Sequence, residues 1–299
     1  MTEFLALTIN GISVGAIYAL IALGIVIIFK STELINFAHP SLLVIGTLIV
    51  ATAYNDFHLP FFVAAPIGIV LTAGLGVAID RVLVRPFYRK RAILAAGIMT
   101  IGLSIVFDTL TTNQIGAQIM SAGNPLGASG VEILSTSIPL ARLAALGTAI
   151  VLVVGFYLWL QRSDFGVGMR AAADDPETAS LMGVRLSRVS MISWAIAAAL
   201  AVVAGIFLVS YPSAGLDVSV GAVALQAIPA AIIGGLDSTT GAVVGGLAVG
   251  LTQVLTLGYQ AQLAFLGLSF SQAAPYILML VVLLVRPAGL FGTKEVSRV

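Results

Sequence analysis

The sequence predicts an all-α, polytopic transmembrane helical bundle that forms a single membrane domain over residues 1–299. Of the 299 residues, 59% are hydrophobic and 9% are charged, and the mean hydropathy is +1.10. Soluble domains carry roughly 25% charged residues, so this composition indicates an integral membrane protein. Helices are favoured over a β-barrel because the apolar segments are long and continuous, whereas barrel strands are short and alternate.

Nine apolar runs of spanning or near-spanning length are the expected membrane segments. They lie at about 4–29, 37–54, 61–80, 92–110, 143–161, 189–210, 220–235, 240–258 and 272–286. The seventh run contains Pro229 and falls short of the roughly 20 residues that a crossing needs. It and the eighth run are joined at 234–238, and the pair is expected to form two crossings or a re-entrant hairpin. The total is then eight or nine segments.

The basic residues predict the orientation. With the N-terminus outside, every lysine and arginine except Arg142 falls in a segment on the inner side. The positive-inside rule therefore predicts an outer N-terminus and a cytoplasmic C-terminus. The first residues lack the basic region of a signal peptide, so we expect the first run to be a retained helix. The longest outer segment, 111–142, is expected to be a solvated connector or a loop that touches a partner.

Glycines recur at the four-residue spacing that lets membrane helices approach closely. The pairs are Gly11/Gly15, Gly241/Gly245 and Gly246/Gly250. This spacing predicts close helix packing around these positions.

A polar segment at 168–188, between two apolar runs, has the residue pattern of a short helix. Asp175 can cap a helix that begins at Pro176, Glu177 falls in the first turn, and Gly183 can end the helix in a left-handed conformation. A helix of about two turns is marginal on its own and needs a packing partner. Its expected docking face consists of three apolar residues: Ala179, Leu181 and Met182. The alternative is an ordinary loop helix packed on its own protein.

The residue types argue against several functions. The chain has no cysteine, and none of its three lysines follows glycine in a phosphate-binding loop. No acid, base, nucleophile and metal-ligand set converges in the apolar runs, so we expect no enzyme. Carboxylates in the spans are sparse, with Asp108 toward an outer end and Asp80 toward an inner end. Passive conduction, or energy from another subunit, therefore fits better than ion coupling.

Two polar clusters are candidates for a transport pathway. The first lies at 33–41, at the expected inner end of the second run. There Asn36 is expected to cap a helix or bond between helices, and His39 to titrate near neutrality or serve structurally. The second runs from Gln226 to Thr240, where a proline-broken segment could expose backbone groups to a cavity. The candidate pathway residues are Asn36, His39, Gln226, Pro229, Gly234, Gly235 and Asp237.

Four motifs in order resemble the shorter permease subunit of branched-chain amino-acid ABC importers. They are 10–24 with Ile35-Asn36-Phe37-Ala38-His39, 170–175 with 179–183, 233–246, and 284–292. The resemblance covers nearly the whole chain. It departs at Pro40-Ser41, where the family usually has glycine and an acidic residue, and at Asp237 and Thr239. These departures leave the substrate open.

The resemblance implies a bacterial inner-membrane protein with four kinds of partner: a second homologous permease, two ATP-binding subunits, a periplasmic substrate-binding protein and the lipid membrane, with no nucleic acid. It implies that ATP is used by the partner subunits and that this chain binds no cofactor. It also implies that 162–188 is a cytoplasmic loop coupled to the ATPase. The residues expected to act there are Arg170, Asp174, Asp175, Pro176, Glu177, Ala179, Leu181, Met182 and Gly183.

The resulting hypothesis is a permease domain that carries branched-chain or similar small amino acids inward by alternating access, driven by ATPase partners. The alternatives are an ABC permease for urea, short amides, sugars or nucleosides, and an ATP-independent channel or facilitator.

Overall fold

The computed structural model describes residues 2–90, 92–116, 119–123, 129–133, 136–210, 215–267 and 269–293. Six helical segments of this part are long and apolar enough to cross a membrane. They are Phe4–Thr32, Phe61–Tyr88, Ile93–Ile115, Leu140–Arg162, Leu186–Ser210 and Thr239–Gly258. The helical membrane architecture is confirmed.

Five of these lie in the helices α1 (Thr2–Thr32), α5 (Ile93–Ile115), α6 (Leu140–Arg162), α9 (Leu186–Ser210) and α12 (Thr239–Gly258). The sixth begins with α3 (Phe61–Ile79) and continues through a π-helical turn into α4 (Arg85–Arg89). The other, shorter helices are α2 (His39–Asn55), α7 (Asp164–Asp174), α8 (Pro176–Leu181), α10 (Val220–Leu225), α11 (Ala227–Gly234) and α13 (Phe270–Val285). A 3₁₀ turn, η2, covers Ala264–Leu266. The expected eight or nine segments exceed the six because α2, α10–α11 and α13 are short.

One element departs from the all-α expectation. Strands β1 (Gly130–Ile133) and β2 (Thr136–Pro139) form an antiparallel hairpin between α5 and α6. Both strands lie in the polar segment 111–142, outside the apolar runs, and in β1 the residues Val131, Glu132 and Ile133 alternate between apolar and polar as is typical of strands. Parts of that segment, 117–118, 124–128 and 134–135, lie outside the described residues.

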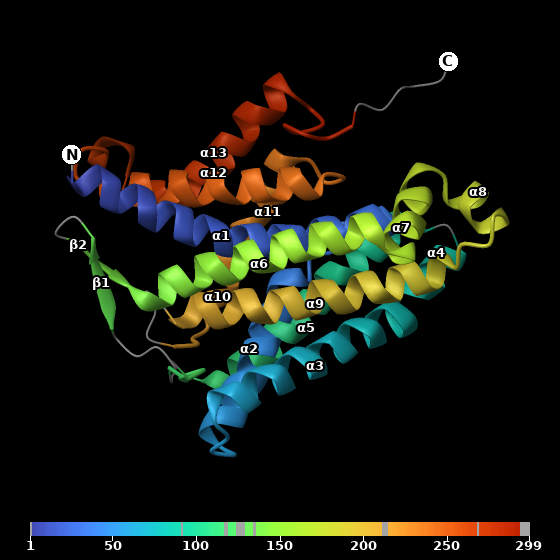
Figure 1. Cartoon of the computed structure of the whole chain (residues 1–299), viewed down its shortest axis with the longest axis horizontal. Coiled ribbons are helices and arrows are strands. Elements are labelled where there is room, and N and C mark those ends of the chain that lie inside the picture. The colour runs from blue at the N-terminus through green and yellow to red at the C-terminus, as the bar shows by residue number, and fades with distance from the viewer. Residues whose placement is uncertain are drawn as a thin grey trace.

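Helix α1 runs through the middle of the bundle, and α6, α9, α11 and α12 pack around it (Figure 1). Its 31 residues extend about 46 Å at 1.5 Å per residue. Because α1 is apolar on all sides, it can be buried on all sides. Tyr18 and Leu20 at its centre are fully buried, as is Trp194 on α9.

The glycine pairs bring α12 into backbone contact with two helices. A β-carbon on Gly250 would lie 2.3 Å from the Cα of Gly15, and one on Gly246 would lie 2.4 Å from the amide nitrogen of Ala19. On another face of α12, a β-carbon on Gly245 would lie 2.0 Å from the carbonyl oxygen of Ala230 in α11. The predicted close packing is confirmed, and α12 is held between α1 and α11.

Helix α3 continues through a π-helical turn, η1 (Asp80–Val84), into α4. Such turns widen the helix and shift the side chains that follow. Asp80 is buried there and accepts a hydrogen bond from the hydroxyl of Ser190 on α9. This bond ties the end of α3 to the start of α9.

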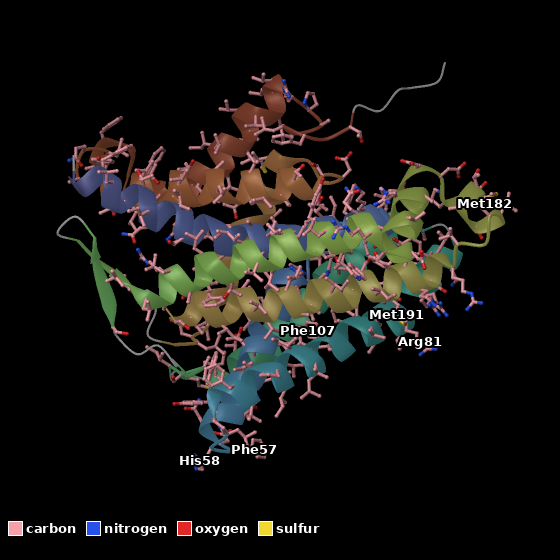
Figure 2. All side chains as sticks on the ribbon, viewed as in Figure 1. Phe57, His58, Arg81, Phe107, Met182 and Met191 are labelled. Carbon is pink, nitrogen blue, oxygen red and sulfur yellow. The ribbon has the colours of Figure 1, made fainter. Side chains whose placement is uncertain are left out.

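The two ends of the bundle differ in what they carry. Helices α4, α7 and α8 lie at one end, and the N-terminus and the β-hairpin lie at the other (Figure 1). Arg81 and Met182 lie at the first end, whereas Phe57 and His58 lie toward the second (Figure 2). The exposed arginines Arg81 and Arg185 thus share an end with the short helix α8.

The chain that follows α13 returns onto the turn between α11 and α12. The amide of Leu290 donates to the carbonyl of Ile233 at 2.8 Å, and that of Phe291 donates to the carbonyl of Gly234 at 3.0 Å. Gly235 adopts φ +103°, a conformation that favours glycine, and touches Gly292. The α11–α12 turn therefore lies beside the end of α13.

Candidate functional site

Helix α8 begins with the cap that the sequence predicts. The Oδ1 atom of Asp175 accepts from the amides of Glu177 at 2.9 Å and Thr178 at 3.1 Å. The Thr178 hydroxyl donates to Oδ2 at 2.5 Å. The hydrogen bonds from Thr178 hold the pKa of the Asp175 carboxyl below its usual range. The carboxylate is therefore charged, and the cap is complete, at neutral pH.

The other end of α8 closes as predicted too. Gly183 has φ +91°. Its amide donates to the carbonyl of Ser180 at 3.1 Å, and the amide of Val184 donates to the carbonyl of Ala179 at 3.0 Å. These two bonds form a Schellman motif, which satisfies carbonyls that the last turn leaves free. Both ends of a six-residue helix are thus fixed by local bonds.

The exposed face of α8 differs in one residue from the expected docking face. Leu181 is 87% exposed and Met182 is 82% exposed, whereas Ala179 is buried. Ala179 is on the side of α8 that packs against its own protein, so we remove it from the docking face. Arg170 lies inward as well, and its Nη1 donates to the carbonyl of Leu160 at 3.0 Å. That bond anchors α7 to the end of α6.

The remaining residues expected to act in this loop, Asp174, Pro176 and Glu177, are exposed beside Asp175. The structure therefore presents a short capped helix with two apolar side chains in solvent. Its expected coupling role remains a prediction.

The Asn36–His39 cluster lies deeper than the sequence suggests. Asn36 is buried, and its Oδ1 accepts from the amide of Ala38 at 3.0 Å, which forms a turn before α2. The His39 ring is fully buried against Gly24, where a β-carbon would lie 2.6 Å from its Cε1 and Nε2 atoms. Gly24 lies eight residues before the end of α1, which is about 12 Å along the helix. The segment before α2 therefore descends into the bundle.

Gln226 belongs to a buried polar cluster at the break between α10 and α11. The Tyr18 hydroxyl lies 2.6 Å from Oε1 of Gln253 and 3.3 Å from Oε1 of Gln226. A hydroxyl donates one proton, so the shorter bond to Gln253 takes it. Sequence reasoning missed Tyr18 and Gln253, although a glutamine within the apolar run 240–258 is a usable signal.

The other candidate pathway residues have packing contacts. Pro229 is buried in α11, and a β-carbon on Gly234 would lie 2.1 Å from the carbonyl oxygen of Gly241. Gly235 forms the turn described above. The Oδ2 atom of Asp237 accepts from the amide of Thr293 at 2.9 Å. These contacts explain the residue types structurally, and a pathway role for them stays a prediction.

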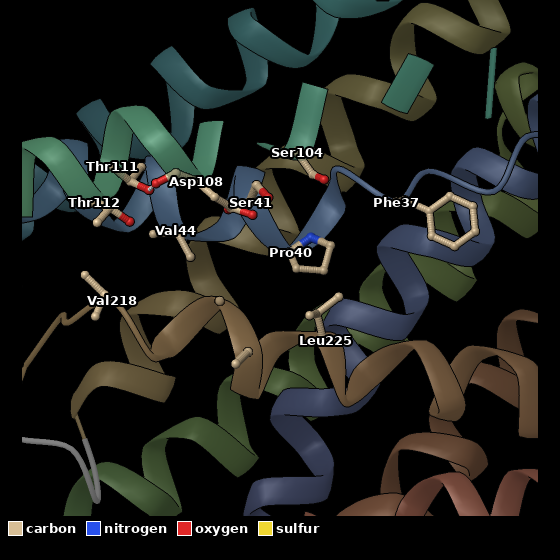
Figure 3. Close-up of a pocket in the computed structure, with 12 residues that line it drawn as sticks. Phe37, Pro40, Ser41, Val44, Ser104, Asp108, Thr111, Thr112, Val218 and Leu225 are labelled. Atoms are coloured by element: carbon tan, nitrogen blue, oxygen red, sulfur yellow. Dashed lines mark hydrogen bonds between the residues drawn. The ribbon is translucent and has the colours of Figure 1, made fainter. Parts of the chain in front are cut away.

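A groove of about 300 Å³ lies among α2, α5 and α10 (Figure 3). Ser41 on α2 and Ser104, Asp108 and Thr111 on α5 contribute polar groups. Val218 and Leu225 form the wall opposite α5 (Figure 3). Within the described residues, none of the seven candidate pathway residues lines this groove. The sequence analysis named Asp108 only as a carboxylate toward an outer end and did not name Ser104 or Thr111, although their spacing of four and three residues in a helix was visible in the sequence.

The family described as "Branched-chain amino acid transport system / permease component" matches residues 7–285. The high-affinity branched-chain amino acid transport system permease protein LivH of Escherichia coli (strain K12) is 29% identical, over 99% of this chain and 98% of that protein. LivH of Salmonella typhimurium (strain LT2) is 30% identical over the same shares. BraD of Pseudomonas aeruginosa, a permease protein of the same description, is 28% identical, again over 99% and 98%.

A solved structure has a similar fold. It is described as PsaBC from Streptococcus pneumoniae in complex with Fab, and it matches with a TM-score of 0.51 and 15% identity over 93% of this chain and 91% of that chain. At this identity the likeness concerns the fold alone. The family match covers nearly all of the bundle, the groove and the α7–α8 loop. The chain therefore belongs to the family of branched-chain amino acid transport system permease components.

Proposed function

We propose that this chain is the membrane-spanning permease subunit of an ABC importer that carries branched-chain or similar small amino acids into the cytoplasm. The observation that carries the proposal is the family match over residues 7–285 together with the exposed, doubly capped helix α8. The chain has no phosphate-binding loop of its own, so the energy comes from ATP used by partner subunits.

Helix α8 is the proposed docking element for an ATP-binding subunit. Leu181 and Met182 extend into solvent from a helix whose two ends are fixed, so an apolar pocket on a partner could hold them without ordering a flexible loop. Helix α8 contacts α7 and α9, and α7 contacts α1 and α6. A displacement of α8 can therefore reach the centre of the bundle. The ATP-binding subunits, in a given nucleotide state, must bind one permease conformation more tightly than the other. Equal affinity for both conformations would leave their equilibrium unchanged.

The proposed assembly contains a second homologous permease, two ATP-binding subunits and a periplasmic substrate-binding protein, in a bacterial inner membrane. The exposed apolar side chains on α5 and α6, such as Ile105 and Val151, suit lipid or a second membrane subunit.

We propose nine membrane segments with the N-terminus outside. Two crossings over 220–258 are favoured over a re-entrant hairpin, because the α11–α12 turn bonds to the chain after α13, on the side where Arg286 lies. Helix α12 also runs antiparallel to α1, with Gly258 beside Leu7 and Gly246 beside Ala19. Arg91, Lys294 and Arg298, which contribute to the orientation argument, lie outside the described residues.

The test places charge on the α8 face. In the double variant Leu181→Asp and Met182→Asp, docking would bury carboxylates without partners, at a cost of about 3 kcal/mol or more. We expect the permease to insert normally, while co-purification of the ATP-binding subunit and amino-acid uptake both fall. The matched control is Phe57→Asp, an exposed apolar residue toward the opposite end, which should leave ATPase co-purification unchanged. Normal ATPase binding by the double variant would show that α8 is an ordinary loop helix.

A further inference from the structure

Helix α5 has a polar face on an otherwise apolar span. Thr100, Ser104, Asp108 and Thr111 follow one another at intervals of four, four and three residues, so they lie on one side of the helix. At the inner end of this face, the Thr100 hydroxyl oxygen accepts from the amide of Phe37 at 3.2 Å. This bond fixes the face against the chain that leads into α2. The other three residues line the groove of Figure 3.

Asp108 is the charged group of this face. It is exposed, and it lies about 10 Å along α5 from Ile115, within the span. The neighbouring side chains Ile105 and Leu110 are apolar and exposed, as expected toward lipid. In the part of the chain that the structure describes, no lysine, arginine or histidine pairs with the Asp108 carboxylate. A carboxylate within a membrane span is costly and is functional by default, so it needs a partner that arrives from elsewhere.

The hydroxyls of Ser104 and Thr111 present acceptors rather than donors to the groove. Ser104 donates its proton to the carbonyl of Ile101 at 2.7 Å, and Thr111 donates to the carbonyl of Phe107 at 3.0 Å. Each hydroxyl proton is thus used within α5, while the oxygen lone pairs remain available. With the carboxylate, this face of the groove offers three acceptor groups. An ammonium group, which has three donors and no acceptor, matches that set. The hydroxyls of Ser41 and Thr112 also line the groove and can donate to the carboxylate end of such a molecule.

The opposite wall of the groove is aliphatic. Val218 and Leu225 lie across from the α5 residues, and Val44 on α2 lies between them (Figure 3). The volume of about 300 Å³ is at the small end of the range of roughly 300–1,000 Å³ found for ligand sites. The groove therefore suits a small molecule with a cationic end and an aliphatic body.

We propose that this groove is a transit site for substrate, in which the Asp108 carboxylate binds the α-ammonium group of a zwitterionic amino acid. The aliphatic side chain of the substrate lies against Leu225 and Val218. Ser104 and Thr111 accept the remaining ammonium hydrogen bonds. This assignment rests on the proposed importer function and goes further, since it names the group of the substrate that the membrane subunit recognises.

The first experiment measures leucine uptake by the complete complex in ATP-loaded proteoliposomes, with saturating binding protein. Asp108→Asn should lower the rate by about ten- to a hundredfold, the factor for losing a charge-assisted hydrogen bond. Asp108→Glu should retain more activity than Asp108→Asn because the charge remains. Asp56→Asn is the matched control, since Asp56 is an exposed carboxylate at the outer end of α2 and outside the groove. Co-purification of the ATPase and of the second permease should be unchanged in all three variants.

The second experiment measures the rate at which a thiol in the groove is modified, and it does not depend on transport. The chain has no cysteine, so Thr112→Cys places a single thiol in the groove lining beside Asp108. We expect aminoethyl methanethiosulfonate, a cation, to react faster than the anionic sulfonatoethyl reagent, and leucine to slow the reaction. In the Asp108→Asn background, both the charge preference and the protection by leucine should disappear.

The outcomes distinguish a failure of the proposed Asp108 site from a failure of the proposed importer function. Wild-type leucine uptake by Asp108→Asn, or unchanged protection of Thr112→Cys, overturns the Asp108 site and leaves the importer function standing. Loss of the second permease from the Asp108→Asn complex also overturns it, because Asp108 would then be an ion-pair partner at a subunit interface. A wild-type complex that binds its ATPase yet moves no amino acid overturns the proposed substrate class and the ammonium site together.

Discussion

Replacing Gly250 by alanine should destabilise the bundle, although alanine is the better helix former. A β-carbon on Gly250 would lie 2.3 Å from the Cα and amide nitrogen of Gly15 and 2.7 Å from the carbonyl oxygen of Gly11, whereas ordinary contact begins at 3.4 Å. Nothing at that contact is a flexible side chain, so α1 and α12 must move apart by about 1 Å in a densely packed interior. Overpacking of this kind costs about 1–3 kcal/mol.

The matched control is Gly155→Ala on α6, where a β-carbon would meet nothing within 4 Å. That variant should be neutral or more stable by about 0.5–1 kcal/mol, the cost of glycine in a helix interior. The double variant Gly246→Ala and Gly250→Ala should cost less than the sum of the two single changes, because one separation of the helices relieves both contacts.

The assay is unfolding of the purified permease by titration with SDS, followed by far-ultraviolet circular dichroism. If Gly250→Ala is as stable as Gly155→Ala, then the α1–α12 contact is loose, and the argument that glycine spacing sets this interface is wrong.

Two further predictions concern the buried polar cluster and the topology. Tyr18→Phe removes the hydroxyl that donates to Gln253 and leaves the half-buried amide oxygen of Gln253 without that donor. The free energy of unfolding should fall by about 1–3 kcal/mol. Tyr157→Phe on the exposed side of α6 should change it little, and equal effects of the two changes would contradict the importance of the Tyr18–Gln253 bond. A cysteine at His58 should react with an impermeant maleimide from outside the cell and one at Asp164 only after permeabilisation; the reverse pattern would refute the proposed orientation.

The local elements were predictable because their causes are local. Each of the nine apolar runs coincides with helix, since backbone groups in lipid must be satisfied within the segment. The ends of α8 followed from Asp175, Pro176 and Gly183, because capping bonds span only a few residues. The β-hairpin at 130–139 was missed, since the composition that indicates a membrane protein says little about a loop outside the membrane.

The arrangement of side chains around the site could be predicted from the sequence only in part. The sequence predicted that Ala179 shares a face with Leu181, but only the packing of α8 against the rest of the chain shows that Ala179 is buried. It likewise placed His39 at the inner end of a span, whereas the chain descends until the ring meets Gly24.

By itself, the sequence determined the membrane-spanning helices, the capped helix α8 and the glycine spacings, because hydropathy, capping and close backbone approach depend on residues within one segment. Only the tertiary structure decided that Gly250 meets Gly15, that Tyr18 meets Gln226 and Gln253, and that Asp108 faces a groove whose opposite wall carries Leu225. These residues come from helices far apart in the chain, and their meeting depends on how whole helices pack, which no local pattern encodes.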